Sequence, residues 1–91
     1  MGPLSSEIPG SELVEAGLRD LAEGRCTIPA LIVSIGAPRL RQLGLEVTSP
    51  IENAEHALYE LLAAEDADSA HGRYNAFIRR LVSFERAACA G

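Results

Sequence analysis

The chain has 91 residues, of which 47% are hydrophobic and only 4% aromatic, and its formal net charge is -5. This apolar content can form one folded core, which excludes disorder for the bulk of the chain. Because there is no tryptophan and few other aromatics, the core must consist mainly of Leu, Ile, Val and Ala, and such a core favours an all-α domain of closely packed helices.

The first ten residues, MGPLSSEIPG, contain two prolines, two glycines and two serines. Such a composition is typical of a flexible segment without regular structure. We therefore expect a flexible leader over residues 1–10 and a single helical domain over residues 11–90.

The first two helices are expected on either side of a short polar connection. Residues 12–23 have apolar side chains at helical spacing, with Ser11 as the expected N-cap and Gly24 as the expected stop. A second helix, containing the apolar run IPALIVSI, is expected to begin at Thr27 and to end at Gly36. Because this run is apolar almost all round, we expect a short, central, buried helix.

Two further helices follow in the middle of the chain. A short helix, PRLRQL, is expected to begin at Pro38 and to end at Gly44. The segment SPIE then reads as a capping box, with Ser49 as the N-cap and Glu52 three positions later. This pattern predicts a fourth helix that begins there and runs to about Glu65.

The last helix is expected to follow the polar turn DADS and to run to about Cys89, which makes it the longest element of the fold. It also changes the sign of the charge. Residues 1–68 carry twelve acids and four arginines, whereas residues 69–91 carry four arginines and one acid. We predict a compact bundle of four to five short helices in which the basic last helix either packs across acidic helices or meets an acidic partner.

The candidate interaction surface lies on this last helix. At 100° per residue, its apolar side chains share one broad arc and its arginines form the two edges opposite. The arginines are either a solvated face whose stems cover the rim of the core, or a groove for a carboxylate-rich or phosphate-bearing partner. The candidate residues are Arg73, Tyr74, Arg79, Arg80 and Arg86.

Glu85 is the only acid of the last helix, and it falls within the apolar arc. A buried carboxylate without a partner is costly, so one possibility is a buried ion pair with Arg39, Arg41 or Arg19. The alternatives are a carboxylate that stays hydrated beyond the core and a catalytic carboxylate. Nothing in the sequence supplies a nucleophile or a metal for the last of these.

The stretch SIGAPRLRQL, residues 34–43, partly resembles the helix-hairpin-helix motif that binds the DNA backbone. Gly36 matches the second glycine of that motif, whereas Ser34 stands where the first glycine belongs. The resemblance implies phosphate contacts by the backbone of Gly36 and by the side chains of Arg39 and Arg41. The alternative is a plain helix–turn–helix corner in the core.

The row Glu52, His56 and Glu60 can be interpreted as a divalent-cation site or as a base tuned by carboxylates, or simply as a solvated helix face. The two cysteines lack a CxxC spacing, and no nucleophile elbow, phosphate loop or zinc spacing is present. We therefore predict no catalytic residues, no cofactor and no metal. The absence of a long apolar run predicts a cytoplasmic protein without membrane contact.

These observations favour a small non-enzymatic interaction module, an accessory or regulatory subunit that either self-associates or docks on a larger protein. The alternative is a nucleic-acid-binding accessory protein that uses the turn at residues 34–43 and the arginines of the last helix. The overall acidity disfavours broad nonspecific nucleic-acid binding. All eight basic residues are arginine, which is typical of GC-rich coding, and the size and helical class are similar to those of small bacterial antitoxins, so we expect a bacterial source.

Overall fold

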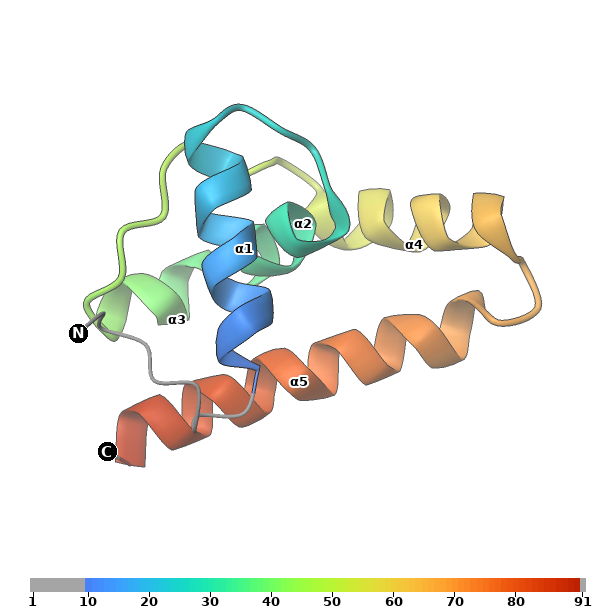
Figure 1. Cartoon of the computed structure of the whole chain (residues 1–91). Helices are drawn as coiled ribbons and strands as arrows, with labels where there is room; N and C mark the ends of the chain where they lie inside the picture. Colours follow the sequence, from blue (N-terminus) through green and yellow to red (C-terminus); the bar gives the residue numbers. More distant parts are fainter. Residues whose placement is uncertain (1–9, 91) are drawn as a thin grey trace.

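The computed structural model describes the backbone of residues 10–90 and the side chains of residues 10–88. This part of the chain contains five helices and no strand (Figure 1), which confirms the predicted all-α fold. The last helix, with 21 residues, is the longest, as expected. The helices are α1 (Ser11–Ala22), α2 (Ile28–Ile35), α3 (Ala37–Gln42), α4 (Ala54–Glu65) and α5 (Ala70–Ala90). Residues 1–9 of the expected leader lie outside the described residues.

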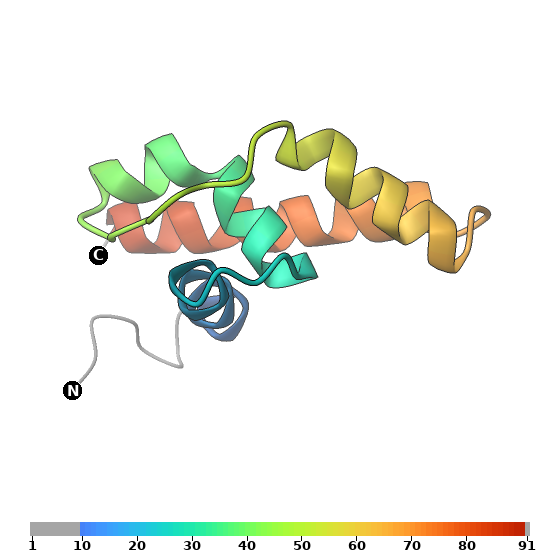
Figure 2. The same cartoon turned by 90° about the horizontal axis from the view of Figure 1, so that it is seen from above.

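The helices are arranged around α2. Figure 1 shows α5 running beneath the other helices. Helix α4 runs above α5, and a short turn joins the end of α4 to the start of α5. In the view from above, α1 lies on one side of α2, whereas α3 and the beginning of α4 lie on the other (Figure 2). The molecule measures 38 × 24 × 20 Å. Beyond α2, the end that carries the α4–α5 turn consists of these two helices alone (Figure 1).

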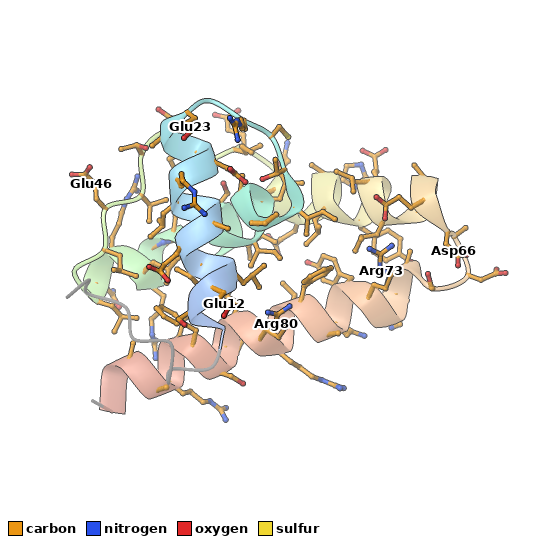
Figure 3. The ribbon with its side chains drawn as sticks, in the orientation of Figure 1. Glu12, Glu23, Glu46, Asp66, Arg73 and Arg80 are labelled. Carbon is orange, nitrogen blue, oxygen red and sulfur yellow. The ribbon has the colours of Figure 1, made fainter. Side chains whose placement is uncertain are left out.

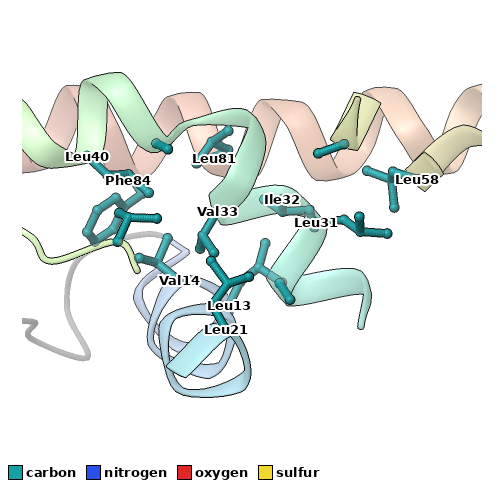
Figure 4. Packing of buried hydrophobic residues seen from close by; sticks show 14 of the residues in the cluster. Leu13, Val14, Leu21, Leu31, Ile32, Val33, Leu40, Leu58, Leu81 and Phe84 are labelled. Atoms are coloured by element: carbon teal, nitrogen blue, oxygen red, sulfur yellow. The ribbon is translucent and has the colours of Figure 1, made fainter. Parts of the chain in front are cut away.

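A single apolar core joins all five helices. Four consecutive apolar residues of α2, from Ala30 to Val33, are almost fully buried, which agrees with the prediction of a central buried helix. Side chains from the other helices surround them (Figure 4). The largest fully buried side chains are Phe84, Leu31, Ile32, Leu40, Leu58, Leu62, Val14 and Val33.

The predicted N-cap of the first helix is wrong by one residue. Ser11 is the first helical residue and is buried, whereas Gly10 caps the helix in the left-handed conformation, with a φ of 78°. A Cβ on Gly10 would lie 2.8 Å from the backbone carbonyl oxygen of Arg80 in α5. The chain therefore turns into α1 directly against the backbone of α5, and only glycine combines the positive φ with that close approach.

The predicted capping box of the fourth helix is also wrong, because α4 begins five residues after Ser49. Both Ser49 and Asn53 have positive φ values, 46° and 52°, and neither residue caps a helix with its side chain. Between them, the backbone N–H of Ile51 donates a 3.0 Å hydrogen bond to the buried Oγ of Ser34 in α2. This tertiary bond ties the segment to α2, and it competes successfully with the local capping pattern.

Other local signals are confirmed. Thr27 caps α2, because its Oγ1 accepts a hydrogen bond from the backbone N–H of Ala30, and the same hydroxyl donates to Asp20 at 2.6 Å. Gly24 and Gly44 end the preceding helical segments with positive φ values of 76° and 93°. The connections around α2 and α3 were therefore predictable from turn chemistry.

Gly17, at the middle of α1, lies directly against α2. A Cβ on this residue would clash with the backbone carbonyl oxygen of Pro29 and would lie 2.7 Å from Cγ1 of Val33. Gly72 in α5 is its natural comparison, because a Cβ there would meet nothing within 4 Å. The two helical glycines therefore have different surroundings: Gly17 permits contact between α1 and α2, and Gly72, in the first turn of α5, faces open space.

We predict that Gly17→Ala destabilises the protein by about 1–3 kcal/mol, because the added methyl group forces α1 away from α2. The control, Gly72→Ala, should stabilise it by roughly 0.5–1 kcal/mol, because alanine is the better helix former in open space. Urea unfolding followed by circular dichroism measures both values. Equal effects of the two substitutions would contradict the close packing of α1 on α2.

Ser34 is the polar link between α2 and the segment before α4. Its Oγ donates a 2.8 Å hydrogen bond to the carbonyl oxygen of Ala30 while accepting the bond from Ile51. We predict that Ser34→Ala costs about 1–2 kcal/mol of unfolding free energy, because the N–H of Ile51 loses its acceptor in a partly buried place. The exposed Ser83→Ala is the control and should change stability by less than about 0.5 kcal/mol. A Ser34→Ala protein as stable as this control would show that the bond contributes nothing.

Candidate interaction surface on the last helix

The four arginines of α5 do not form one surface. Arg73 is half-buried, and its Nη1 donates to Oε1 of Glu65 at 2.7 Å, which closes the turn between α4 and α5. Figure 3 shows Arg73 between these two helices, and Arg80 on the edge of α5 near the beginning of α1. Arg73 therefore has a structural partner within the fold, and Arg80 lies beside a helix of its own chain.

Arg79 and Arg86 form the other edge of α5. Both are exposed, and neither forms an ion pair within residues 10–88. They are separated by two helical turns, so their side chains leave the helix on nearly the same side. Arg80 is exposed as well, so Arg79 and Arg86 differ from it in sharing one edge of the helix.

Ile78 and Val82 lie beside these arginines, one helical turn apart. Both are half-buried, but neither is among the side chains that pack against the buried core, unlike Phe77 on the same helix. The angular pattern placed both residues within the core-facing arc, and the structure places them at its margin. We call Ile78, Val82, Arg79 and Arg86 the outer flank of α5.

Tyr74 continues the outer flank towards α4. Its ring packs against the ring of Tyr59, with centroids 5.9 Å apart and planes tilted by 60°. Desolvation by burial raises the pKa of the Tyr74 hydroxyl, and the negative charge of Glu55 raises this pKa further. No pattern in the sequence singles out Tyr59, which is the only large hydrophobic side chain among the described residues that is exposed, at 40%.

Glu85 lies over the turn between α2 and α3. A Cβ on Gly36 would lie 3.0 Å both from Oε2 of Glu85 and from Cδ1 of Leu81, so these two side chains cover the glycine. Burial raises the pKa of the Glu85 carboxyl above its ordinary value of 4.5, and the positive charge of Arg39 lowers it by a smaller amount. Glu85 forms no ion pair within 4.0 Å in the part of the chain that the structure describes. Of the three arginines considered as partners, Arg39 is the one whose charge acts on it.

The candidate phosphate-binding groups are only partly available. Gly36 is buried beneath Glu85, and its backbone N–H donates to the carbonyl oxygen of Ile32 at 3.2 Å. The guanidinium of Arg41 donates to the carbonyl oxygen of Val47 at 2.7 Å, which holds the connection after α3. The exposed Arg39 is the remaining member of this set. The Glu85 carboxylate therefore covers the glycine to which the resemblance assigned a phosphate contact.

The predicted row of Glu52, His56 and Glu60 does not share one helix, because α4 begins after Glu52. His56 Nε2 lies 3.2 Å from Oε1 of Glu60, and both side chains are exposed. Among the described residues, no three His, Cys, Asp or Glu side chains gather where they could hold a metal ion. No helix within this part of the chain has both the length and the apolar character needed to cross a bilayer.

The sequence and the structure were also compared with known proteins. The chain matches no family model, no curated protein and no solved structure.

The raised pKa of Glu85 makes the stability of the fold depend on pH. Its pKa in the folded protein is raised, so the folded state holds its proton more tightly than the unfolded state does, and this carboxyl favours folding at low pH. That contribution is lost as the pH rises from 4.5 through the folded pKa. We predict that Glu85→Gln is more stable than the wild type near neutral pH, and that the difference shrinks as the medium is acidified.

Urea unfolding between about pH 4 and about pH 7 measures this difference. The exposed Glu46→Gln is the control and should follow the wild type. A Glu85→Gln protein less stable than the wild type at neutral pH would show that attraction by Arg39 outweighs desolvation.

Proposed function

We propose that the protein is a non-enzymatic interaction module, an accessory or regulatory subunit that binds a protein partner through the outer flank of α5. The observation that carries this proposal is the pairing of Ile78 and Val82, which pack outside the core, with Arg79 and Arg86, which are exposed beside them. Apolar contact area bordered by arginines is typical of protein-binding surfaces. The proposal assigns no catalytic role to any residue.

The charge of the chain supports a protein partner over a nucleic acid. The net charge is -5, and the basic groups of α5 that remain exposed are few. Nucleic-acid binding draws its affinity from many phosphate contacts, which require a broad basic footprint. The burial of Gly36 and the engagement of Arg41 further weaken the alternative based on the α2–α3 turn. A cytoplasmic location and a bacterial source stay predictions from the sequence.

Capture experiments with matched variants test the proposed surface. We predict that immobilised wild-type protein retains a protein from the extract of its native cells, and that Ile78→Glu/Val82→Glu loses it because charges replace the apolar contact. Ala22→Glu/Thr48→Glu adds the same charge at exposed positions outside α4 and α5, and it should retain the partner. Quantitative mass spectrometry of the retained proteins measures the difference.

Two results would contradict the proposal. Equal retention by all three proteins would show that the outer flank is not the binding surface. Binding of DNA or RNA at low salt, with an affinity that falls steeply as salt is added and is weakened by Arg39→Ala, would favour the nucleic-acid alternative.

A further inference from the structure

The outer flank of α5 continues across the turn end of the molecule onto α4. Tyr74, Ile78 and Val82 are spaced four residues apart and therefore form one stripe along α5. At its end, the ring of Tyr74 contacts the exposed ring of Tyr59 on α4. These four side chains form an apolar strip that spans both helices.

Opposite charges border this strip. On the α4 border, Glu55 lies close enough to Tyr74 to raise the pKa of its hydroxyl. The segment from Glu52 to Asp68 adds no arginine, although Glu65 is paired with Arg73 and Glu60 lies beside His56. On the other border, Arg79 and Arg86 are exposed. The α4 side of the strip is therefore acidic and the α5 side is basic.

A surface with an apolar middle, one acidic border and one basic border is complementary to itself. A two-fold axis parallel to the helices places α4 of one copy opposite α5 of the other, so that acids face arginines at both borders. An axis perpendicular to the helices in the same plane would place α5 opposite α5 and arginine opposite arginine. Like charges across an interface disfavour this second arrangement.

We propose that a second copy of this chain covers the strip, and that the α4–α5 hairpins of the two copies form a four-helix bundle in which α5 of each copy packs against α4 of the other. The proposal rests on the proposed function and names the partner of the same surface. A closed two-fold dimer uses the same patch on both copies, which agrees with a surface that carries both charge signs. It also explains why a tyrosine is exposed where only two helices are present.

Sedimentation of the purified full chain tests the dimer. From about 5 μM to about 500 μM, the wild type is expected to shift from its 9.7 kDa monomer towards twice that mass. Ile78→Glu/Val82→Glu is expected to remain a monomer throughout, with an unchanged circular dichroism spectrum because neither side chain packs on the core. The control Ala22→Glu/Thr48→Glu carries the same added charge outside α4 and α5, and it is expected to dimerise like the wild type.

A charge exchange tests the arrangement of the helices. Glu55→Arg places arginines opposite the arginines of the other copy, and it is expected to weaken the dimer by about tenfold or more. Arg79→Glu is expected to do the same by placing acids opposite acids. Combining the two substitutions in one chain restores opposite charges at both borders, and it is expected to recover most of the lost affinity. Failure of the combined variant to recover it would overturn the proposed pairing of α4 with α5.

Sedimentation tests the dimer, whereas capture tests the interaction module, so the two proposals can fail separately. A wild type that stays monomeric at every concentration overturns the dimer, and so does a dimer that survives Ile78→Glu/Val82→Glu. In either case, loss of a different captured protein with that same variant would still support an interaction module. Equal capture by all variants would overturn the proposed function itself.

Discussion

Helix α2 has no face that can remain in water, and the arrangement of the other helices follows from this. Four consecutive apolar residues of this short helix, Ala30 to Val33, are buried, so neighbouring elements must cover it on every side. Its one polar side chain, Ser34, forms hydrogen bonds both along its own helix and with the backbone of Ile51. On the opposite side, α1 can pack closely because Gly17 has no Cβ to separate the two backbones. Shape and hydrogen bonding around α2 therefore specify where α1 and the segment before α4 lie.

The same constraint explains which parts of the fold could be predicted. The order of the helices follows from apolar periodicity and from local stop signals such as Gly24 and Gly44, which need only their immediate neighbours to act. The capping pattern at Ser49 was misleading because the acceptor on Ser34, 17 residues from Ile51, bonds the intervening backbone. The start of α1 moved because the chain meets the backbone of α5 at Gly10. In both cases, contacts between segments distant in the sequence decided the boundary.

The candidate site was predictable to a smaller extent, because one helix provides both structure and surface. The sequence correctly marked α5 as basic, but it could not tell that Arg73 would be held by Glu65 of α4. It also placed Ile78 and Val82 with the core. Periodicity shows which side of a helix a residue is on, but it does not show how much of that side the neighbouring helices cover. The neighbouring helices do not cover the edge of the apolar arc of α5, so Ile78 and Val82 remain outside the core.

Part of α5 remains uncovered by other helices for a geometric reason. A chain of 91 residues with one short central helix can surround that helix, but it cannot also enclose a 21-residue helix along its whole length. Where α4 and α5 extend past α2, each has only the other as a neighbour, and their outward sides meet water (Figure 1). Polar side chains could have filled these positions at no cost to the core. Tyr59 is exposed on α4, and Ile78 and Val82 lie outside the core on α5, beside the exposed Arg79 and Arg86. Apolar side chains at these positions are better explained by a surface that a partner covers.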